Sequence, residues 1–412
     1  METEKETIFG KFLFPNLFRA FRISIHHSQI FAALLGLALV VLAGRLMDMN
    51  KTVVAASNGV TELDTFVLEG PSGLEFFVEK HQNDVHQGVF STLWNFTSKR
   101  FHGIVKAILI LNISGAETNT VEMLGAIGWA FRYHFFYTLI FFLILTAVIA
   151  SMGGVICRIA ALQLAIGEKP GFGESLRFGL KNFFNFFAAP LVPVFIIICI
   201  GAPLIILGLI YSIPYAGDIL MAVFLPLAFL AGMIMAIIAI GAAAGFTLMF
   251  PSMAYENSDC FDAISQSYEY IYMQPWRFVF YVILTAFYGA ACYTFVRFFT
   301  FTLMLLTYLF IKLGLIGDAK MTQIWPRPEF MNLFNSVLTE PATYWGQSFA
   351  SFFVHLWALV IIGIVISFLI SFYFTATTII YALLRYKIDK IPIDKIYIQS
   401  QGFESTGQPS EK

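Results

Sequence analysis

The sequence predicts an all-α integral membrane protein with six transmembrane helices in a parallel-repeat bundle. Of its 412 residues, 58% are hydrophobic and only 12% are charged, whereas soluble domains carry roughly 25% charged residues. A chain with 46 Phe residues cannot hide its apolar surface in one water-soluble core, so lipid must cover much of it. The formal net charge of −1 leaves no basic field to attract a polyanion, so we expect no nucleic-acid partner.

Six apolar stretches are long enough to cross a hydrocarbon layer of about 30 Å, which requires about 20 helical residues. They are residues 28–48, 133–155, 188–212, 219–250, 277–313 and 351–385. The last three exceed the thickness of a bilayer and must tilt, kink or extend beyond it. Arg277 and Arg297 are separated by about 30 Å of helix, which predicts one at each interface and residues 298–313 outside. We expect the Arg297 side chain to snorkel toward the headgroups, and the alternative is that Arg297 is a functional charge inside the membrane.

Basic residues on both sides of the spans predict the orientation. Lysines and arginines gather before the first span and after the last one, at Lys5, Lys11, Arg19, Arg22, Arg385, Lys387, Lys390 and Lys395. Because basic flanks stay in the cytoplasm, we expect residues 1–27 to be a cytoplasmic interfacial segment and residues 386–412 a cytoplasmic tail. His26 and His27 stand beside Arg22, a grouping that indicates contact with lipid headgroups.

Two loops on the opposite side predict an extracytoplasmic helical cap, formed by residues 49–132 and 314–350. The first loop contains an apolar run at helical spacing, which predicts an amphipathic helix through Val85, Val89, Phe90, Leu93, Trp94 and Phe96. Residues 85–112 and 298–350 would supply a surface for a partner. Large aromatic anchors are available there at Trp94, Trp325, Trp345 and Trp357.

A weak internal repeat, with an offset of 88 residues, relates the segments that follow the second and fourth spans. The aligned pairs include Glu168 with Glu256, Glu174 with Asp262, and Gly179 with Ser267. Two spans separate the copies, so both should lie on the cytoplasmic side, related by an axis along the membrane normal. Each copy has an amphipathic pattern that predicts an interfacial helix, at residues 170–187 and 259–274.

The second copy has chemically marked ends. Asp262 suits the positive first turn of a helix, and Pro275 ends that helix. Trp276 and Arg277 can anchor the next span among the headgroups. The candidate residues of the repeat junction and the membrane interface are therefore Glu168, Glu174, Glu256, Asp262, Ser267, Trp276 and Arg277.

The same region carries a family resemblance. Three segments matter, namely Pro251-Ser252-Met253-Ala254-Tyr255-Glu256, Phe261-Asp262-Ala263-Ile264-Ser265-Gln266-Ser267-Tyr268 and Pro275-Trp276-Arg277. Together they resemble the signature of the YciC-like family of bacterial membrane proteins. They are similar also to the membrane domain fused to some glycerophosphodiester phosphodiesterases. The resemblance covers mainly residues 245–290, with a weaker similarity at 161–190. It implies a location in the bacterial inner membrane. No second catalytic domain follows, so phosphodiesterase activity is not expected.

No motif predicts a catalytic, metal or cofactor site. The seven His and four Cys residues form neither His-Glu-x-x-His nor Cys-x-x-Cys. Neither a phosphate-binding glycine motif nor a nucleophile elbow is present. Glu168 and Glu256 could form a symmetric carboxylate pair, but acids beside helix starts are also expected from capping alone. We therefore expect no cofactor and no enzymatic activity.

Two functional hypotheses remain. The leading one is a scaffold, assembly or lipid-interface component of a membrane complex, with membrane lipids and a protein partner or second copy as its contacts. The alternative is a passive or lipid-directed transporter with a cavity between the two repeats. Gly201, Pro203 and Pro226 are the candidate helix-break residues for such a cavity. The middles of the spans lack Asp, Glu and Lys, which disfavours a proton relay or a carrier of charged substrates.

Overall fold

The computed structural model describes residues 14–57, 59–81, 84–213, 216–314, 325, 327–330, 333 and 345–397. Within these residues, six helical runs are long and apolar enough to cross a membrane. They are α2 (His27–Met47), α6 (Phe135–Val148) continuing through η3 (Ile149–Gly153) into α7 (Gly154–Ala165), α9 (Phe183–Tyr211), α10 (Ala216–Glu256), α12 (Pro275–Gly314) and α14 (Trp345–Ile388). The predicted fold class, all-α with six membrane-spanning helices, is confirmed. The expected segments 1–13 and 398–412, most of 314–350, and the Trp345 side chain lie outside the described residues.

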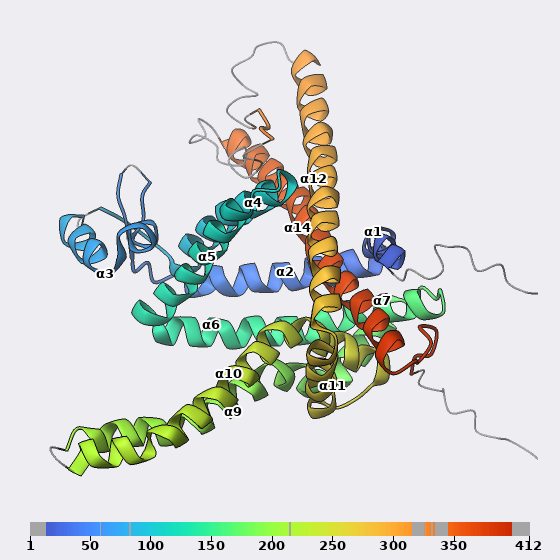
Figure 1. Ribbon diagram of the computed structural model, residues 1–412. Helices are drawn as coiled ribbons and strands as arrows, with labels where there is room; N and C mark the ends of the chain where they lie inside the picture. Colours follow the sequence, from blue (N-terminus) through green and yellow to red (C-terminus); the bar gives the residue numbers. More distant parts are fainter. Residues whose placement is uncertain are drawn as a thin grey trace, which may run out of the picture.

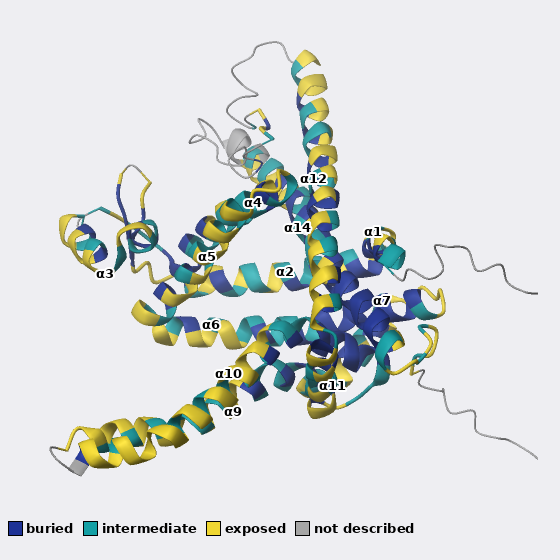
Figure 2. Cartoon of the chain, in the orientation of Figure 1, coloured by how far each residue is buried: buried dark blue, intermediate teal, exposed yellow. Residues whose placement is uncertain are grey.

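The long helices spread apart from one end of the molecule (Figure 1). We call this end the base. It comprises α1 (Arg19–Ser24), α7, α8 (Phe172–Lys181), α11 (Cys260–Met273), residues 389–397 and the adjoining ends of α10 and α14. Both described ends of the chain lie there: the Phe14 ring packs edge-on to Phe280, and the Tyr397 N–H donates to the Tyr255 carbonyl at 3.0 Å. Buried residues concentrate in the base, whereas the α9–α10 hairpin is exposed along most of its length (Figure 2).

Helix α7 is the centre of the base. All of its residues except Ala165 are buried, so the second span continues to Ala165, past the expected end at residue 155. A π-helical turn over Ile149–Gly153 precedes it and changes the helix register, as such insertions do. Gly153 and Gly154 admit neighbouring rings, because a Cβ there would lie 2.7 Å from Phe374 and 2.8 Å from Phe186.

The two short helices of the predicted repeat lie at the base. Helix α11 spans Cys260–Met273 and begins at the Asp259 cap, whose side chain accepts from the Asp262 N–H. Helix α8 spans only Phe172–Lys181, because Asn182 leaves the helical conformation and α9 begins at Phe183. The expected helix at 170–187 is thus too long at its C-terminal end.

The first loop forms a domain of helices with one small sheet, which we call the outer domain, and its extracytoplasmic location stays a prediction. Its helices are α3 (Glu62–Lys80), α4 (Val89–Leu109) and α5 (Ile113–Tyr133), and β1 (Val53–Ala55) pairs antiparallel with β2 (Val85–Gln87). The predicted amphipathic helix therefore starts at Val89. Val85 instead belongs to β2 and is 67% exposed, because the extended Gly88 separates strand from helix.

Asp48 joins this outer domain to the spans. It follows the last residue of α2 and is 8% exposed. Its carboxylate accepts from the backbone N–H groups of Phe90 at 2.9 Å and Ser91 at 2.8 Å, and the Tyr137 hydroxyl donates to it at 2.8 Å. Gly88, the residue before α4, has no side chain to satisfy those first-turn donors. Asp48 supplies the missing cap from 42 residues away.

Arg297 contacts the second outer loop. Its guanidinium donates to the Phe330 carbonyl at 2.9 Å and lies over the Phe330 ring, and the residue is 9% exposed. The side chain is therefore held by protein and does not snorkel freely into open headgroups. Helix α12 continues past it to Gly314, and α4 reaches the same level through the contact between His102 and the Tyr293 hydroxyl at 3.1 Å.

Candidate functional site

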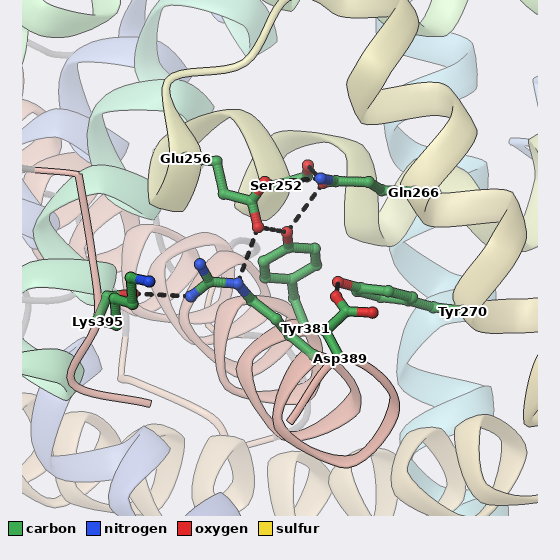
Figure 3. A network of polar contacts seen from close by, with 8 residues as sticks. Ser252, Glu256, Gln266, Tyr270, Tyr381, Asp389 and Lys395 are labelled. Atoms are coloured by element: carbon green, nitrogen blue, oxygen red, sulfur yellow. Dashed lines mark hydrogen bonds and ion pairs between the residues drawn. The ribbon is translucent and has the colours of Figure 1, made fainter. Parts of the chain in front are cut away.

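A network of polar side chains links α10, α11 and α14 at the base (Figure 3). We call it the junction. Its members are Ser252, Glu256, Gln266, Tyr270, Tyr381, Arg385 and Asp389.

The spacing of these residues explains why they meet. Ser252 and Glu256 are four residues apart on α10, and Gln266 and Tyr270 are four apart on α11. On α14 and just beyond it, Tyr381, Arg385 and Asp389 follow the same interval. Side chains four residues apart share one helix face, so each element turns a polar stripe toward the other two. Asn257 ends α10 there with φ of 54°, in the left-handed region that Asn tolerates at helix ends.

Glu256 is the centre of the junction. One of its oxygens lies 2.8 Å from Arg385 Nε and accepts from the Tyr381 hydroxyl at 2.8 Å. The other accepts from the Gln266 amide at 2.6 Å. The charges of Glu256 and Arg385 neutralise each other where the Arg385 side chain is only 8% exposed. A buried charge needs such a partner, because the cost of leaving it alone is several kcal/mol.

Further hydrogen bonds extend the junction in both directions. The Ser252 hydroxyl donates to the Gln266 carbonyl oxygen at 2.6 Å, and the Tyr381 hydroxyl reaches the same oxygen at 3.0 Å. The Tyr270 hydroxyl donates to Asp389. Burial first, and then the Asp389 carboxylate, raise the pKa of Tyr270, so the phenol keeps its proton and acts as a donor.

Arg158 is a second buried cation, and it ties the segment after α14 to the base. Its guanidinium donates to the carbonyls of Ala254 and Tyr397, each at 2.8 Å, and packs on the Phe178 ring at 4.6 Å. The sequence pattern places Arg158 with Lys169, Arg177 and Lys181 in a basic cytoplasmic loop, but the structure buries it inside α7. Its signal was available, since a single charge inside the apolar run of α7 requires partners supplied by protein.

The structure places the residues predicted for the repeat in different environments. Glu256 is central to the junction, whereas Glu168 is exposed in the loop after α7. Glu174 and Asp262 lie in the first turns of α8 and α11, as capping predicts. Ser267 is fully buried, donates to the Ala263 carbonyl at 2.6 Å and faces Gly245.

The two residues expected as anchors lie at the start of α12, which begins at Pro275. Trp276 is 85% exposed and Arg277 is half-buried. Both are free of the junction hydrogen bonds described above, and their anchoring role stays a prediction.

The two segments of the repeat lie side by side. The Asn182 amide after α8 donates to the Asn257 side chain after α10 at 2.9 Å. The residues before α8 and α11, Gly171 and Asp259, also differ by the predicted offset. The expectation that both segments share one face of the molecule agrees with this contact. That the segments are a true repeat stays a prediction.

The candidate helix-break residues belong to the α9–α10 hairpin. Helix α9 continues through Gly201 and Pro203, and α10 through Pro226. A Cβ on Gly201 would meet its nearest neighbour, Met235, at 3.7 Å, an ordinary packing distance. The cavities at the base and in the outer domain are lined by other residues.

The geometry of the junction is suited to holding helices together. Both oxygens of Glu256 and both amide atoms of Gln266 are occupied by neighbouring side chains. Among the described residues, no three His, Cys, Asp or Glu side chains converge in a way that could hold a metal ion.

Comparison with family models, with characterised proteins and with solved structures found no match to this chain. The fold and the junction define its class as a multi-pass α-helical membrane protein. The YciC-like resemblance stays a prediction.

Proposed function

We propose that this chain is a non-enzymatic assembly component of a membrane complex, and that its α9–α10 hairpin is the surface that meets a protein partner or a second copy. The observation that carries this proposal is the exposure of the hairpin. In the most apolar window of α9, and in that of α10, no residue is buried. The hairpin projects from the base away from α2, α6 and α12 (Figure 1), so its apolar side chains must be covered by lipid or by another protein.

The junction supports the same proposal. A protein that presents a long hairpin needs a rigid mount, and the Glu256–Arg385 pair fixes the base end of α10 against α14. The side chains of Glu256, Gln266 and Tyr381 in the junction bond to one another. This arrangement favours a structural role over a catalytic one.

Particle mass tests the proposal. The full chain would be extracted from its own membrane in lipid-polymer discs, and the protein mass in each disc would be compared with the 46.3 kDa of one chain. We expect a discrete larger assembly that is lost in the Ile205→Ala/Phe229→Ala variant, whose side chains are 68% and 70% exposed on the hairpin. The control is Phe299→Ala, 62% exposed on α12. Particles with one chain only would contradict the proposal.

Flux measurements address the transport hypothesis. The purified chain in sealed vesicles should pass no lipid or small solute faster than protein-free vesicles. A flux that is abolished when Gly201 and Pro203 are replaced by Leu would favour the transporter instead.

We further propose an inner-membrane location with both termini in the cytoplasm. This proposal is supported by exposed basic side chains at that end of the molecule, namely Arg22, Lys169, Arg177 and Lys181. Basic segments that flank spans stay in the cytoplasm. Cys260 is only 8% exposed and is a poor reporter. Cysteines introduced at exposed Glu168 and Ser72, in a Cys199→Ser background, would report the two sides. An impermeant thiol reagent should label Ser72→Cys in intact cells and Glu168→Cys only after lysis.

A further inference from the structure

A cavity of about 620 Å³ opens at the base between α1, the start of α2 and the loop after α7. Its polar wall consists of Arg19, Arg22, His26, His27, Gln163 and Lys169, and Ile23 and Ile25 add an apolar side. Its size falls within the ~300–1,000 Å³ of small-ligand sites. Three permanent cations share this wall, and among the described residues no carboxylate lines it.

Two buried polar atoms of residues that line the cavity have no hydrogen-bond partner among the described residues. Gln163 is 8% exposed, and its amide nitrogen has no hydrogen-bond partner within the described part of the chain. The Nδ1 atom of His26 is buried and equally unpartnered there. An unsatisfied buried donor costs about 1–3 kcal/mol, and such a group in a native structure requires an explanation. Both nitrogens are closed to water, so each side chain must turn toward the cavity before a bound acceptor of hydrogen bonds satisfies it.

The start of α2 adds a third contribution. This 21-residue helix begins at His27, has no acidic residue in its first turn, and receives no side-chain cap from His26. Free N–H groups and the helix dipole make such an end attractive to anions. Burial, then His27, and then Lys169 lower the pKa of His26, which agrees with a positive potential in the cavity.

The position of the cavity indicates where the anion comes from. His27 is the first residue of one span, and Gln163 lies two residues before the end of another. The cavity is therefore at the level where the hydrocarbon layer ends and phospholipid phosphates begin. Ile25 is 50% exposed beside the basic residues, so an amphiphile could keep its apolar part in contact with protein.

We propose that the cavity formed by Arg19, Arg22, His26, Gln163 and Lys169 binds the phosphate group of an anionic phospholipid. This site is independent of the assembly function proposed above, because it lies at the opposite end of the molecule from the hairpin tip. Arginine and lysine donate charge-assisted hydrogen bonds to the phosphate oxygens, and the Gln163 amide gives it a neutral donor.

Lipid titration tests the site. The purified full chain in neutral detergent would be titrated separately with phosphatidylglycerol, phosphatidylcholine and inorganic phosphate, and bound ligand would be counted by native mass spectrometry. We expect one phosphatidylglycerol to bind at least tenfold more tightly than phosphatidylcholine. Arg22→Gln and Lys169→Gln should each weaken it about tenfold, the loss expected from one charge-assisted bond.

Matched controls separate the site from general surface charge. Arg177→Gln and Lys181→Gln remove equally exposed cations from α8 and should change the affinity less than twofold. Gln163→Met keeps the side-chain size while removing the unpartnered donor. It should weaken phosphatidylglycerol binding severalfold, yet leave the unfolding temperature of the lipid-free protein unchanged or higher, which a merely structural residue would not do.

Several results would overturn the proposal. Equal binding of the two lipids would show that charge is not recognised. Equal losses in the α8 controls would show that no local site exists, and unaltered binding by both Arg22→Gln and Lys169→Gln would exclude this cavity. Binding of inorganic phosphate without phosphatidylglycerol would exclude the lipid as the source while leaving a phosphate site in place.

Discussion

Helix α7 at the base and the α9–α10 hairpin are surrounded by different media, although both belong to strongly apolar spans. Eleven of the twelve residues of α7 are buried by protein. In α9, by contrast, only Phe186, Ala189 and Pro193 are buried, all of them near its base end. The two regions show that an apolar helix in this chain can serve either as a core element or as a surface.

The polar residues follow this difference. Helix α7 contains Arg158, whose guanidinium finds two backbone carbonyls. Helix α9 has no charged residue, and the charges of α10 are confined to its ends, at Asp218 and Glu256. Protein can supply hydrogen-bond partners to a buried charge, whereas hydrocarbon cannot. The distribution of charge therefore reports which helices are enclosed by protein.

The same substitution at a buried and at an exposed position of the hairpin is the strongest test of the difference between the base and the exposed hairpin. Phe186 is fully buried and stacks on Phe250 at 5.5 Å, whereas Phe229 is 70% exposed. We expect Phe186→Ala to lower the free energy of unfolding by about 3–5 kcal/mol, since it leaves a cavity, and Phe229→Ala to change it by about 0.5 kcal/mol at most. Unfolding in mixed micelles measures both. Similar losses would mean that the hairpin is packed as tightly as the base.

Removing the central charge of the junction should have the next largest effect. Glu256→Gln leaves Arg385 buried without its countercharge. We expect a loss of about 2–3 kcal/mol, below the usual cost of breaking a buried pair, because the Glu256 side chain is 21% exposed. Glu168→Gln, at the aligned and exposed position, is the control and should change stability by no more than about 0.5 kcal/mol. A stable Glu256→Gln protein would show that the base does not depend on this pair.

The Asp48 cap tests whether the outer domain is held by polar contacts, as the base is. Asp48→Ala removes the acceptor for two first-turn N–H groups of α4 and should cost about 1–2 kcal/mol. Hydrogen exchange should accelerate at Phe90 and Ser91 and stay unchanged in α11. Glu117→Ala, at an exposed position of α5, should leave exchange in α4 as it is. Unaltered protection of α4 after Asp48→Ala would contradict the capping role.

The smallest expected effect is a pH dependence in the outer domain. Glu62 is 8% exposed and accepts from the Val54 N–H at 2.6 Å. Burial raises its pKa above the ordinary value of 4.5, despite the opposing effect of that hydrogen bond. The folded state therefore holds the proton more tightly than the unfolded state does. Its stability should fall as the pH rises through 4.5 toward the folded pKa.

The protection factors of the Val54 and Ala55 amides against hydrogen exchange, measured as a function of pH, test this dependence. Glu62→Gln should flatten the profile, because the amide does not titrate while its oxygen can still accept from Val54. Glu75→Gln, at an exposed position of α3, should leave the profile unchanged. A protection factor of these amides that rises with pH in the original chain would reverse the assigned sign.

Much of the fold could be predicted because it depends on local chemistry. Runs of apolar residues gave six spans, and only their ends moved, as for the second span, which continues to Ala165. Helix α11 lies within one residue of the expected 259–274 at each end, because Asp259 and Pro275 act on adjacent backbone. The junction was predicted only in part. The sequence predicted that Glu256 forms a carboxylate pair with Glu168 or caps a helix. It used Arg385, the actual partner of Glu256, only to predict the orientation in the membrane.

The sequence by itself determined that this chain carries six spans suited to a membrane, and it placed both ends of α11 within one residue, since burial in hydrocarbon and capping act on neighbouring residues. Only the tertiary structure decided which spans are enclosed and which are exposed. It also brought Tyr381 to Glu256 across 125 positions, Asp48 to α4, and Gln163 to the arginines of α1. Such contacts depend on which helices pack against one another. The six spans have similar hydropathy, so hydropathy does not specify which of them are neighbours.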